Sequence, residues 1–280
     1  MSGAERIGVV GLSHLGSVMA ACWAELEHPV IGFDPSTRVV EGLRAGRAPL
    51  FEPGLDAMIQ ANVERGHLTF TTALGEAVRG VPYVFIAFDT PGDANDRLDL
   101  SPIESILGEL APDLADGATV VVSSQVPVGT CRRWRDEILR ARGPRTVEVV
   151  YSPENLQLGD ALRCYLRPDR VIVGGDEGPS RQRVVELFSR LNAPVLTMNL
   201  ATAEMAKHAL NGFLATSVSF INEIATLCER VGADVLPVVD ALKSDPRIGP
   251  RAFLSPGLGF AGGTLARDVH VLREAGRGKG

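Results

Sequence analysis

The sequence predicts a doubly wound α/β domain that is followed by a long helix and a small helical domain. Through the first two-thirds of the chain, short β-branched runs alternate with stretches of helical character. Most of these runs are continuously apolar, which is typical of strands buried on both faces of a parallel sheet. After about Leu196 the alternation stops, and one helical stretch extends from Thr202 to Val231.

The first part of the chain contains six expected strands, which are Ile7–Val10, Val30–Phe33, Val84–Phe88, Thr119–Ser123, Val147–Val150 and Val171–Val173. The clearest helices between them are Leu15–Leu26, Pro102–Leu114 and Arg181–Leu191. This βαβα alternation predicts a doubly wound sheet whose strands run parallel.

The second part of the chain begins with the long helix, for which Thr202 is the expected cap. Thirty helical residues span about 45 Å. Apolar residues occur on more than one side of this helix, so we expect it to be buried between domains or subunits. A short helix over Val235–Leu242 and a Gly/Pro-rich loop over Asp245–Gly263 follow. We expect the domain boundary near residue 198.

The composition is that of a globular protein. Of the 280 residues, 45% are apolar and 22% are charged. The net charge of −6 disfavours general binding to the phosphate backbone of nucleic acids. Four scattered cysteines, Cys22, Cys131, Cys164 and Cys228, make neither a zinc pattern nor a disulfide framework. With no targeting segment and no apolar stretch of roughly 20 residues, we expect a cytoplasmic protein with no bound metal and no membrane contact.

A glycine-containing loop follows the first expected strand. The segment Gly11-Leu12-Ser13-His14-Leu15-Gly16 reads G-x-S-x-x-G, where dinucleotide-binding domains have G-x-G-x-x-G. Gly11 permits a tight turn, and Gly16 lets the following helix pack closely on the strand. The start of that helix directs free N–H groups at a phosphate. Ser13 places a hydroxyl, a hydrogen-bond donor, where the backbone normally approaches the pyrophosphate.

An acidic residue ends the second expected strand. Asp34 lies 18 residues after Gly16, where a carboxylate accepts hydrogen bonds from the adenosine ribose. An acid at this position favours NAD over NADP, because it repels a 2′-phosphate. The loop, the strands and Asp34 together predict a Rossmann-like domain that binds NAD. The alternative is a Rossmann-like domain that binds no dinucleotide.

Further short motifs occur in order along the chain. They are Glu52-Pro53-Gly54-Leu55, Thr90-Pro91, Val126-Pro127-Val128-Gly129-Thr130, Ser152-Pro153-Glu154, Pro168-Asp169-Arg170, Ala203-Glu204-x-x-Lys207-x-x-x-Asn211, Phe220-Ile221-Asn222-Glu223, Arg247-Ile248-Gly249 and Pro256-Gly257-x-Gly259-Phe260-x-Gly262-Gly263. Through these motifs nearly the whole chain resembles the UDP-glucose/GDP-mannose dehydrogenases, a family of nucleotide-sugar 6-dehydrogenases. The resemblance implies an NAD-binding domain over residues 1–198, a long helix with a helical central domain over 199–280, and a homodimer.

The resemblance also implies a reaction. The family oxidises a primary alcohol of a nucleotide sugar to an aldehyde and then to an acid, using two NAD. Hydride transfer needs a base for the alcohol proton and a donor for the developing oxyanion. The second step needs a cysteine thiolate, which adds to the aldehyde and leads to a thioester that water hydrolyses.

The family's site residues can be placed on matching positions of this chain. Lys207 and Asn211 match the pair that holds the substrate oxygen, and their i, i+4 spacing puts them on one helix face. Asp268 matches the residue that orients water or the lysine, and Glu154 matches the carboxylate of thioester hydrolysis. Cofactor candidates besides Gly11, Ser13, Gly16 and Asp34 are His14, Leu15, Arg38, Thr90, Pro91 and Gln125. Substrate candidates are Asn155, Leu156, Phe253, Gly259 and Arg247, the last acting from the neighbouring subunit.

Several positions depart from the family pattern. When the chain is aligned on Gly259 and Asp268, the nucleophilic cysteine falls on Thr264. A threonine hydroxyl is almost un-ionised at neutral pH, so Thr264 is expected to line a pocket. Gln125 replaces a threonine, Asn155 a phenylalanine, Leu158 a second glutamate and Arg267 a lysine. We therefore expect a two-electron oxidation of a nucleotide sugar or a related phosphorylated sugar.

Other interpretations remain open. The full reaction could proceed through a hydrated aldehyde, which needs no thiol. The chain could be a non-catalytic paralogue that binds a nucleotide or sugar and regulates or pairs with an active dehydrogenase. A short β-hydroxyacid-dehydrogenase-like enzyme would also have two domains and a lysine and asparagine on one helix. Because the family carries a third, C-terminal domain and this sequence stops about a dozen residues after Asp268, it is either naturally short or truncated.

Overall fold

A computed structural model describes residues 4–90, 98–143, 146–154, 156–260 and 263–277. Two compact units are present among these residues. Residues 4–90 and 99–205 form the first unit, and residues 206–277 together with Leu98 form the second. Each unit has its own apolar core.

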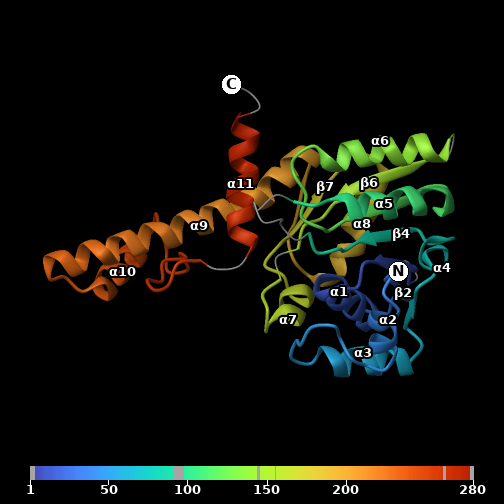
Figure 1. The fold of residues 1–280 in the computed structure, drawn as a ribbon, viewed down its shortest axis with the longest axis horizontal. Helices are drawn as coiled ribbons and strands as arrows, with labels where there is room; N and C mark the ends of the chain where they lie inside the picture. Colours follow the sequence, from blue (N-terminus) through green and yellow to red (C-terminus); the bar gives the residue numbers. More distant parts are fainter. Residues whose placement is uncertain (1–3, 91–97, 144–145, 155, 261–262, 278–280) are drawn as a thin grey trace. The chain divides into compact units, whose positions relative to one another are not determined.

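The first unit is built on an eight-stranded sheet with the order β3-β2-β1-β4-β5-β6-β7-β8. Four of its strands, β2, β4, β6 and β7, are labelled in Figure 1. The strands are β1 (Ile7–Val10), β2 (Val30–Phe33), β3 (Leu68–Thr71), β4 (Tyr83–Ile86), β5 (Ala118–Val122), β6 (Val147–Tyr151), β7 (Val171–Gly174) and β8 (Val195–Met198). From β1 the chain proceeds outward in one direction to β3 and then returns to build the other half from β4. This is the doubly wound order, and it confirms the fold class.

The prediction that all strands run parallel was wrong at one position. β7 pairs antiparallel with β6, through Tyr151 and Gly174, whereas β1 to β6 are parallel and β8 is parallel to β7. The connection from β6 to β7 contains only the six-residue helix α7 (Ala161–Leu166), which is about 9 Å long. Parallel neighbours usually need a longer crossover helix that returns the chain along the full strand.

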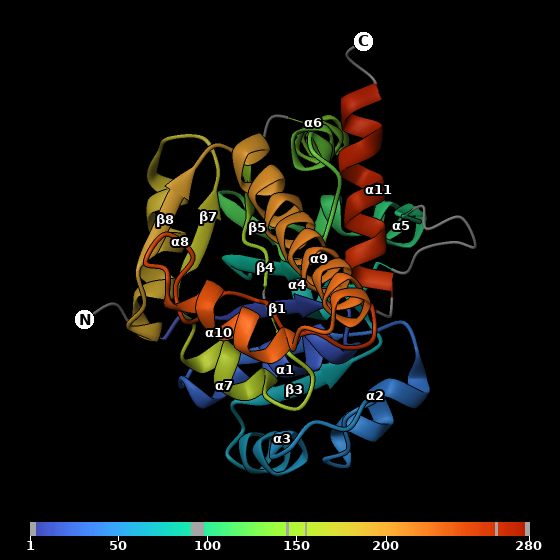
Figure 2. The same cartoon turned by 90° about the vertical axis from the view of Figure 1, so that its left-hand side faces the viewer.

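Helices cover both faces of this sheet (Figure 2). They are α1 (His14–Glu25), α2 (Thr37–Arg44), α3 (Leu55–Glu64), α4 (Leu74–Val78), α5 (Ser101–Leu110), α6 (Thr130–Arg142), α7 and α8 (Pro179–Phe188), with 3₁₀ turns η1 (Ala111–Asp113) and η2 (Ser189–Leu191). Ile7 and Val9 of β1 belong to the core that α1, α3, α7 and α8 form. Gly8, between these two residues, faces α4 on the other side of the sheet. A Cβ on Gly8 would lie 2.1 Å from the carbonyl oxygen of Ala77.

The second unit contains most of α9 (Leu200–Val231), together with α10 (Val235–Ser244) and α11 (Gly263–Arg277). Its small core packs Ile221 of α9 against Val239 of α10 and Leu254. The long helix begins two residues before its predicted start, and Thr202 is not its cap. Instead the side chain of Asn199 accepts the Thr202 N–H at 2.8 Å.

Candidate functional site

The phosphate loop, Gly11–Gly16, joins β1 to α1. Gly11 has φ +94°, and a Cβ there would lie 2.8 Å from the ring of Phe88. A Cβ on Gly16 would lie 1.7 Å from the carbonyl oxygen of Gly11, so both positions require glycine, as the sequence analysis expected. The first intrahelical bond runs from Ser17 N to Ser13 O at 3.0 Å. The N–H groups that precede it remain for an anion.

Ser13 stands where the usual motif has its second glycine. Its Oγ is buried, does not cap α1, and has no hydrogen-bond partner within the described residues. A buried hydroxyl without a partner costs about 1–3 kcal/mol, so a ligand oxygen at this position would remove an existing penalty. Free N–H groups beside an orphaned hydroxyl form a donor set that fits a pyrophosphate. The loop is therefore compatible with NAD despite the missing glycine.

Asp34 follows β2 and faces the same loop. Its Oδ2 accepts the N–H of Leu12 at 2.9 Å, and its Oδ1 accepts the N–H of Ser36 at 2.9 Å. A carboxylate offers about four lone-pair positions, so acceptor capacity remains for ribose hydroxyls. Arg38, another predicted cofactor residue, lies exposed on α2.

Two more predicted cofactor residues lie after neighbouring strands, β4 and β5. The hydroxyl of the buried Thr90 donates to the carbonyl oxygen of Gln125 at 3.0 Å. Because β4 and β5 are parallel, their carboxyl ends share one edge of the sheet, and the structure brings these two residues together there. Pro91, which was predicted beside them, lies outside the described residues.

A buried carboxylate holds His14, the first residue of α1. The Oε2 atom of Glu52 accepts from His14 Nε2 at 3.1 Å, and Glu52 also accepts the N–H groups of Gly159 at 3.0 Å and Ala161 at 2.8 Å. Glu52 is only 3% exposed. Burial raises the pKa of this carboxyl, but the bonds from Ala161, Gly159 and His14 outweigh burial and hold the pKa below its usual value. Glu52 is therefore an ionised buried group.

The predicted residues after β6 lie in the segment that leads to α7. Glu154 is half-buried, and its charge adds to burial in raising the pKa of the Cys22 thiol. Leu156 packs against the core of the first unit. Leu158, which replaces the family's second glutamate, is 73% exposed. Asn155 lies outside the described residues.

The second unit contains the predicted residues Asn211 and Asp268, which the structure brings into contact. Asp268 on α11 and His208 on α9 are both fully buried. Asp268 Oδ1 accepts from His208 Nδ1 at 2.6 Å, and Asp268 Oδ2 accepts from Asn211 Nδ2. We call these three residues the Asp268 cluster. Lys207, half-buried, directly precedes His208 in the chain.

His208 was not among the predicted site residues. The available signal was its spacing, since a residue three positions before Asn211 shares a helix face with it. The contact with Asp268 uses one N–H of the Asn211 amide and so fixes that amide's orientation. The second N–H of Asn211 can then be directed at a substrate oxygen.

The remaining predicted residues of the second unit are exposed. Thr264 lies at the start of α11, one helical turn before Asp268. Arg247 pairs with Asp245 at 2.6 Å, which lowers the pKa of the Asp245 carboxyl. Phe253 is 52% exposed, and Gly259 has open space around the position of a Cβ.

Cys22 and Cys131 lack the properties of a substitute nucleophile. Burial raises the pKa of the Cys22 and Cys131 thiols well above the usual value, and Glu204 raises that of Cys131 further. Cys228 is also buried, on α9, and Cys164 lies on α7. A buried thiol with a raised pKa stays protonated and unreactive at neutral pH.

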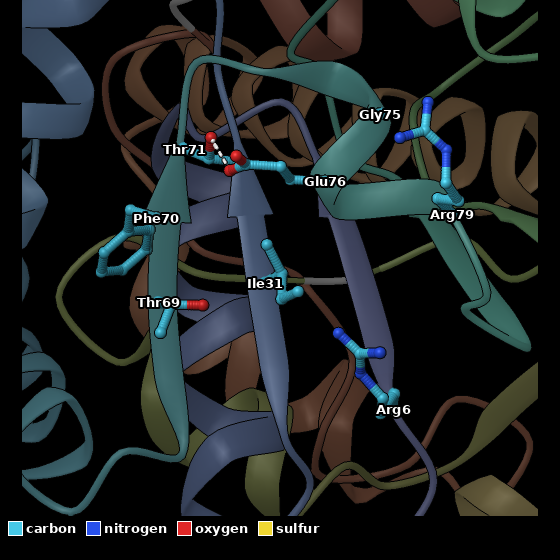
Figure 3. A pocket seen from close by; sticks show the side chains of 8 residues that line it. All are labelled: Arg6, Ile31, Thr69, Phe70, Thr71, Gly75, Glu76 and Arg79. Carbon is cyan, nitrogen blue, oxygen red and sulfur yellow. Dashed lines mark hydrogen bonds between the residues drawn. The ribbon is translucent and has the colours of Figure 1, made fainter. Parts of the chain in front are cut away.

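A pocket of about 410 Å³ lies beside α4 (Figure 3). Its polar groups are partly paired, since the Thr71 hydroxyl donates to Glu76 at 2.6 Å and Arg79 bonds Asp113 at 2.9 Å. The lining residues are Arg6, Ile31, Thr69, Phe70, Thr71, Gly75, Glu76 and Arg79, none of which is a predicted site residue.

The described residues contain neither a metal-binding cluster nor a membrane-spanning helix. No three of their His, Cys, Asp or Glu side chains gather in a way that could hold a metal ion. None of their helices combines the length and the apolar character needed to cross a membrane.

Two family models match this chain. Residues 5–192 match the NAD-binding domain of the UDP-glucose/GDP-mannose dehydrogenase family, and residues 201–280 match its central domain. The chain belongs to the UDP-glucose/GDP-mannose dehydrogenase family. The resemblance inferred from the short motifs is thereby confirmed, and the cofactor of this NAD-binding domain is NAD.

Individual proteins similar to this chain are members of the same family. The chain is 35% identical over 277 residues to the UDP-glucose 6-dehydrogenase TuaD of Bacillus subtilis, covering 99% of this chain and 60% of TuaD. It is 38% identical over 274 residues to a UDP-glucose 6-dehydrogenase of Rhizobium meliloti, covering 95% and 62%. The solved UDP-glucose dehydrogenase of Pyrobaculum islandicum has a TM-score of 0.92 at 32% identity, covering 99% and 66%. The chain thus spans about 60% of the length of the curated relatives it matches.

Proposed function

We propose that this chain oxidises an alcohol of a nucleotide sugar, or of a related phosphorylated sugar, with NAD and by two electrons. The observation that carries the proposal is the Asp268 cluster, in which His208 directly follows Lys207 in the sequence. In this chain Thr264 stands at the position of the family's cysteine. We assign cofactor binding to residues 1–198 and binding of the substrate oxygen to residues 199–280.

The residues of the second unit have the chemistry that alcohol oxidation needs. Lys207 and the free N–H of Asn211 would donate hydrogen bonds to the substrate oxygen and stabilise the alkoxide. Asp268, held by His208 and Asn211, would orient Lys207 or a water as the acceptor of the hydroxyl proton. NAD, held by the Gly11–Gly16 loop and Asp34, would supply a two-electron hydride acceptor, so the alcohol would lose a hydride and a proton and become an aldehyde or ketone.

Further oxidation to an acid would require an aldehyde adduct that can lose a second hydride. A cysteine thiolate forms such an adduct readily, whereas a threonine hydroxyl needs a neighbouring base. Thr264 lies exposed on the first turn of α11, and each of the cysteines lies elsewhere in the chain. Without a thioester, Glu154 has no hydrolysis to assist, so we propose that it lines the site.

The test counts NADH. Purified chain with NAD⁺ and either UDP-glucose or GDP-mannose is expected to release one NADH per substrate and an aldehyde-level product. Thr264→Cys is expected to raise the ratio toward two NADH and to give an acid, because the thiolate supplies the missing adduct. Thr264→Ser is the matched control and leaves the ratio at one. Two NADH and an acid from the unchanged chain would contradict the two-electron proposal.

The non-catalytic paralogue is the second candidate function. The replacement of several family positions favours it, namely Ser13, Gln125, Leu158 and Thr264. The same assay separates the two candidates, because a paralogue would bind NAD⁺ and form no NADH with either sugar nucleotide. The Asp268 cluster argues against this candidate, since a pure binding protein has little need of a buried carboxylate that holds Asn211 and His208.

We propose a homodimer that forms through α9. Phe213, Phe220 and Leu227 lie seven residues apart, and their exposed fractions are 67%, 47% and 51%. Residues at this spacing share one side of a helix. The buried residues of α9, such as Ile221, lie on another side. One side of α9 is therefore buried within the chain. A second copy of the chain would cover the exposed side that carries Phe213, Phe220 and Leu227.

A further inference from the structure

The motif Glu52-Pro53-Gly54-Leu55 is not used by the proposed reaction. Gly54 has φ +82° and precedes α3, and Leu55 is fully buried in the core. Gly54 thus serves the turn before α3, and Leu55 serves the apolar core; neither role needs a charged group. Glu52 is different, because a carboxylate is costly to bury unless several donors surround it.

The donors around Glu52 come from two distant segments. His14, the first residue of α1 in the phosphate loop, lies 38 positions away in the sequence. Gly159 and Ala161, at the start of α7, lie 107 and 109 positions away. Because an ionised carboxylate only accepts, His14 Nε2 carries a hydrogen and donates it. One buried group thus joins the phosphate loop to the segment that runs from β6 past Glu154 to α7.

We propose that Glu52 is a positioning residue that couples NAD binding at the phosphate loop to the start of α7, through His14. Glu52 itself is shielded from solvent. It acts by fixing the side chain of His14 at the first turn of α1, where a pyrophosphate would bind. The same carboxylate takes the place of a side-chain cap for α7, since Asp160 makes no such bond.

The coupling has a physical basis in burial. A hydrogen bond to a charged group is stronger where water is excluded. The bonds from His14 and from α7 end on the same Glu52 carboxylate, so a shift of that carboxylate changes both. An anion that fixes the first turn of α1 therefore also restricts Glu52, and through it the N–H groups of Gly159 and Ala161. We expect bound NAD⁺ to make the start of α7 more rigid.

The first experiment measures NAD⁺ affinity by calorimetry. Glu52→Gln preserves shape but replaces one acceptor oxygen with a donor, so one of the three bonds is lost. We expect the Kd for NAD⁺ to rise about ten-fold, the lower range for losing a bond to a charged group. Glu25→Gln is the matched control, because Glu25 holds the opposite end of α1 through Asn62 at 2.9 Å. We expect it to leave the Kd unchanged.

A double-mutant cycle tests whether Glu52 acts through His14. In a His14→Phe background, Glu52→Gln is expected to change the NAD⁺ Kd by less than about two-fold, because the link is already absent. If Glu52 only capped α7, Glu52→Gln would lower Tm by the same amount in the unchanged chain and in the His14→Phe background. The Kd for NAD⁺ would then stay unaffected.

Hydrogen exchange supplies a readout that needs only His14→Phe, in case Glu52→Gln does not fold. NAD⁺ is expected to slow amide exchange over residues 159–166 in the unchanged chain and to leave it unaltered in His14→Phe. The inference is overturned if His14→Phe keeps this protection, or if Glu52→Gln binds NAD⁺ within about two-fold of the unchanged chain.

The inference rests on NAD binding and not on the proposed oxidation. A chain that binds NAD⁺ with this coupling and forms no NADH would contradict the proposed function alone. A folded chain that binds no NAD⁺ would overturn both the cofactor assignment and the coupling.

Discussion

Three carboxylates are buried in the described part of the chain, and each joins segments that are distant in sequence. Glu52 joins α1 to α7, Glu204 joins α9 to α6, and Asp268 joins α11 to α9. A buried charge without partners is very unfavourable, so each carboxylate requires its donors to keep their positions. Single residues of this kind determine where the backbone groups near the site are held.

The stability that Glu52 contributes should depend on pH. Its pKa is lower in the folded chain than its usual value of 4.5. A lowered pKa means that the contribution is complete above 4.5 and is lost as the pH falls through the folded value. A protonated Glu52 resembles glutamine, with one acceptor and one donor. The Tm difference between the unchanged chain and Glu52→Gln is therefore expected to be largest above pH 4.5 and to shrink as the pH falls below that value.

Thermal melts over this range check the prediction, with Glu25→Gln as the control. Glu25 is 40% exposed on its side chain, and the Tm difference for its variant is expected to be small at every pH. A Tm difference for Glu52→Gln that does not shrink at any pH below 4.5 at which the protein is folded would contradict the assigned ionisation.

Individual residues were predictable where local geometry alone requires a residue type. Gly11 and Gly16 could be assigned because only glycine fits a tight strand-to-helix turn. Asn211 and Asp268 were each predicted from the family motifs, but not as partners of one another, and His208 was not predicted. Its contact depends on how α9 packs on α11, over a sequence separation of 60 residues. Such packing has no local signal in one sequence.

At the scale of elements, the sequence predicted the strands that are buried on both faces of the sheet and missed the strands at its edges. β1 and β2 have the predicted bounds, because they lie inside the sheet and read as continuous apolar runs. β3 and β8 were missed, and both are edge strands. Every other residue of β3 is polar, which is typical of a strand with one exposed face. The reversal of β7 was also missed, because periodicity indicates a strand and not its direction.

Glu204 joins two elements, and its removal should destabilise the first unit. Its carboxylate accepts the N–H groups of Gly129 at 2.6 Å and Cys131 at 2.8 Å, at the start of α6. Glu204→Gln is expected to lower the free energy of unfolding by about 2–3 kcal/mol, because one buried donor loses its acceptor. Glu223→Gln, an exposed position on the same helix, is expected to change it by less than about 0.5 kcal/mol.

Urea unfolding followed by circular dichroism measures both variants. If the two glutamates prove equivalent, Glu204 does not hold α6 to α9 as the contact indicates. A larger loss at Glu204 would explain the acidic residue of the Ala203-Glu204 motif as a helix cap supplied by a distant element, a role that the sequence analysis did not assign.

For the whole molecule, α9 carries the strongest prediction beyond a single chain. The stripe formed by Phe213, Phe220 and Leu227 is apolar and exposed, whereas most exposed positions on soluble helices are polar. A stable interface buries at least about 1,000 Å². One helix stripe supplies part of this area, and the surface next to it must supply the rest. A second copy of α9 would supply an identical stripe, as a two-fold dimer requires.

Light scattering on a gel-filtration column should therefore give twice the chain mass of 29.8 kDa for the unchanged protein. Phe220→Glu is expected to give the single-chain mass at the same concentration, because a charge in the middle of the stripe would be buried without a partner. Thr226→Glu is the matched control, since Thr226 is exposed but lies about 120° around the helix from Phe220. A dimer that survives Phe220→Glu and dissociates with Thr226→Glu would place the interface on a different side of α9. A single-chain mass for the unchanged protein at high concentration would leave the stripe without the partner proposed for it.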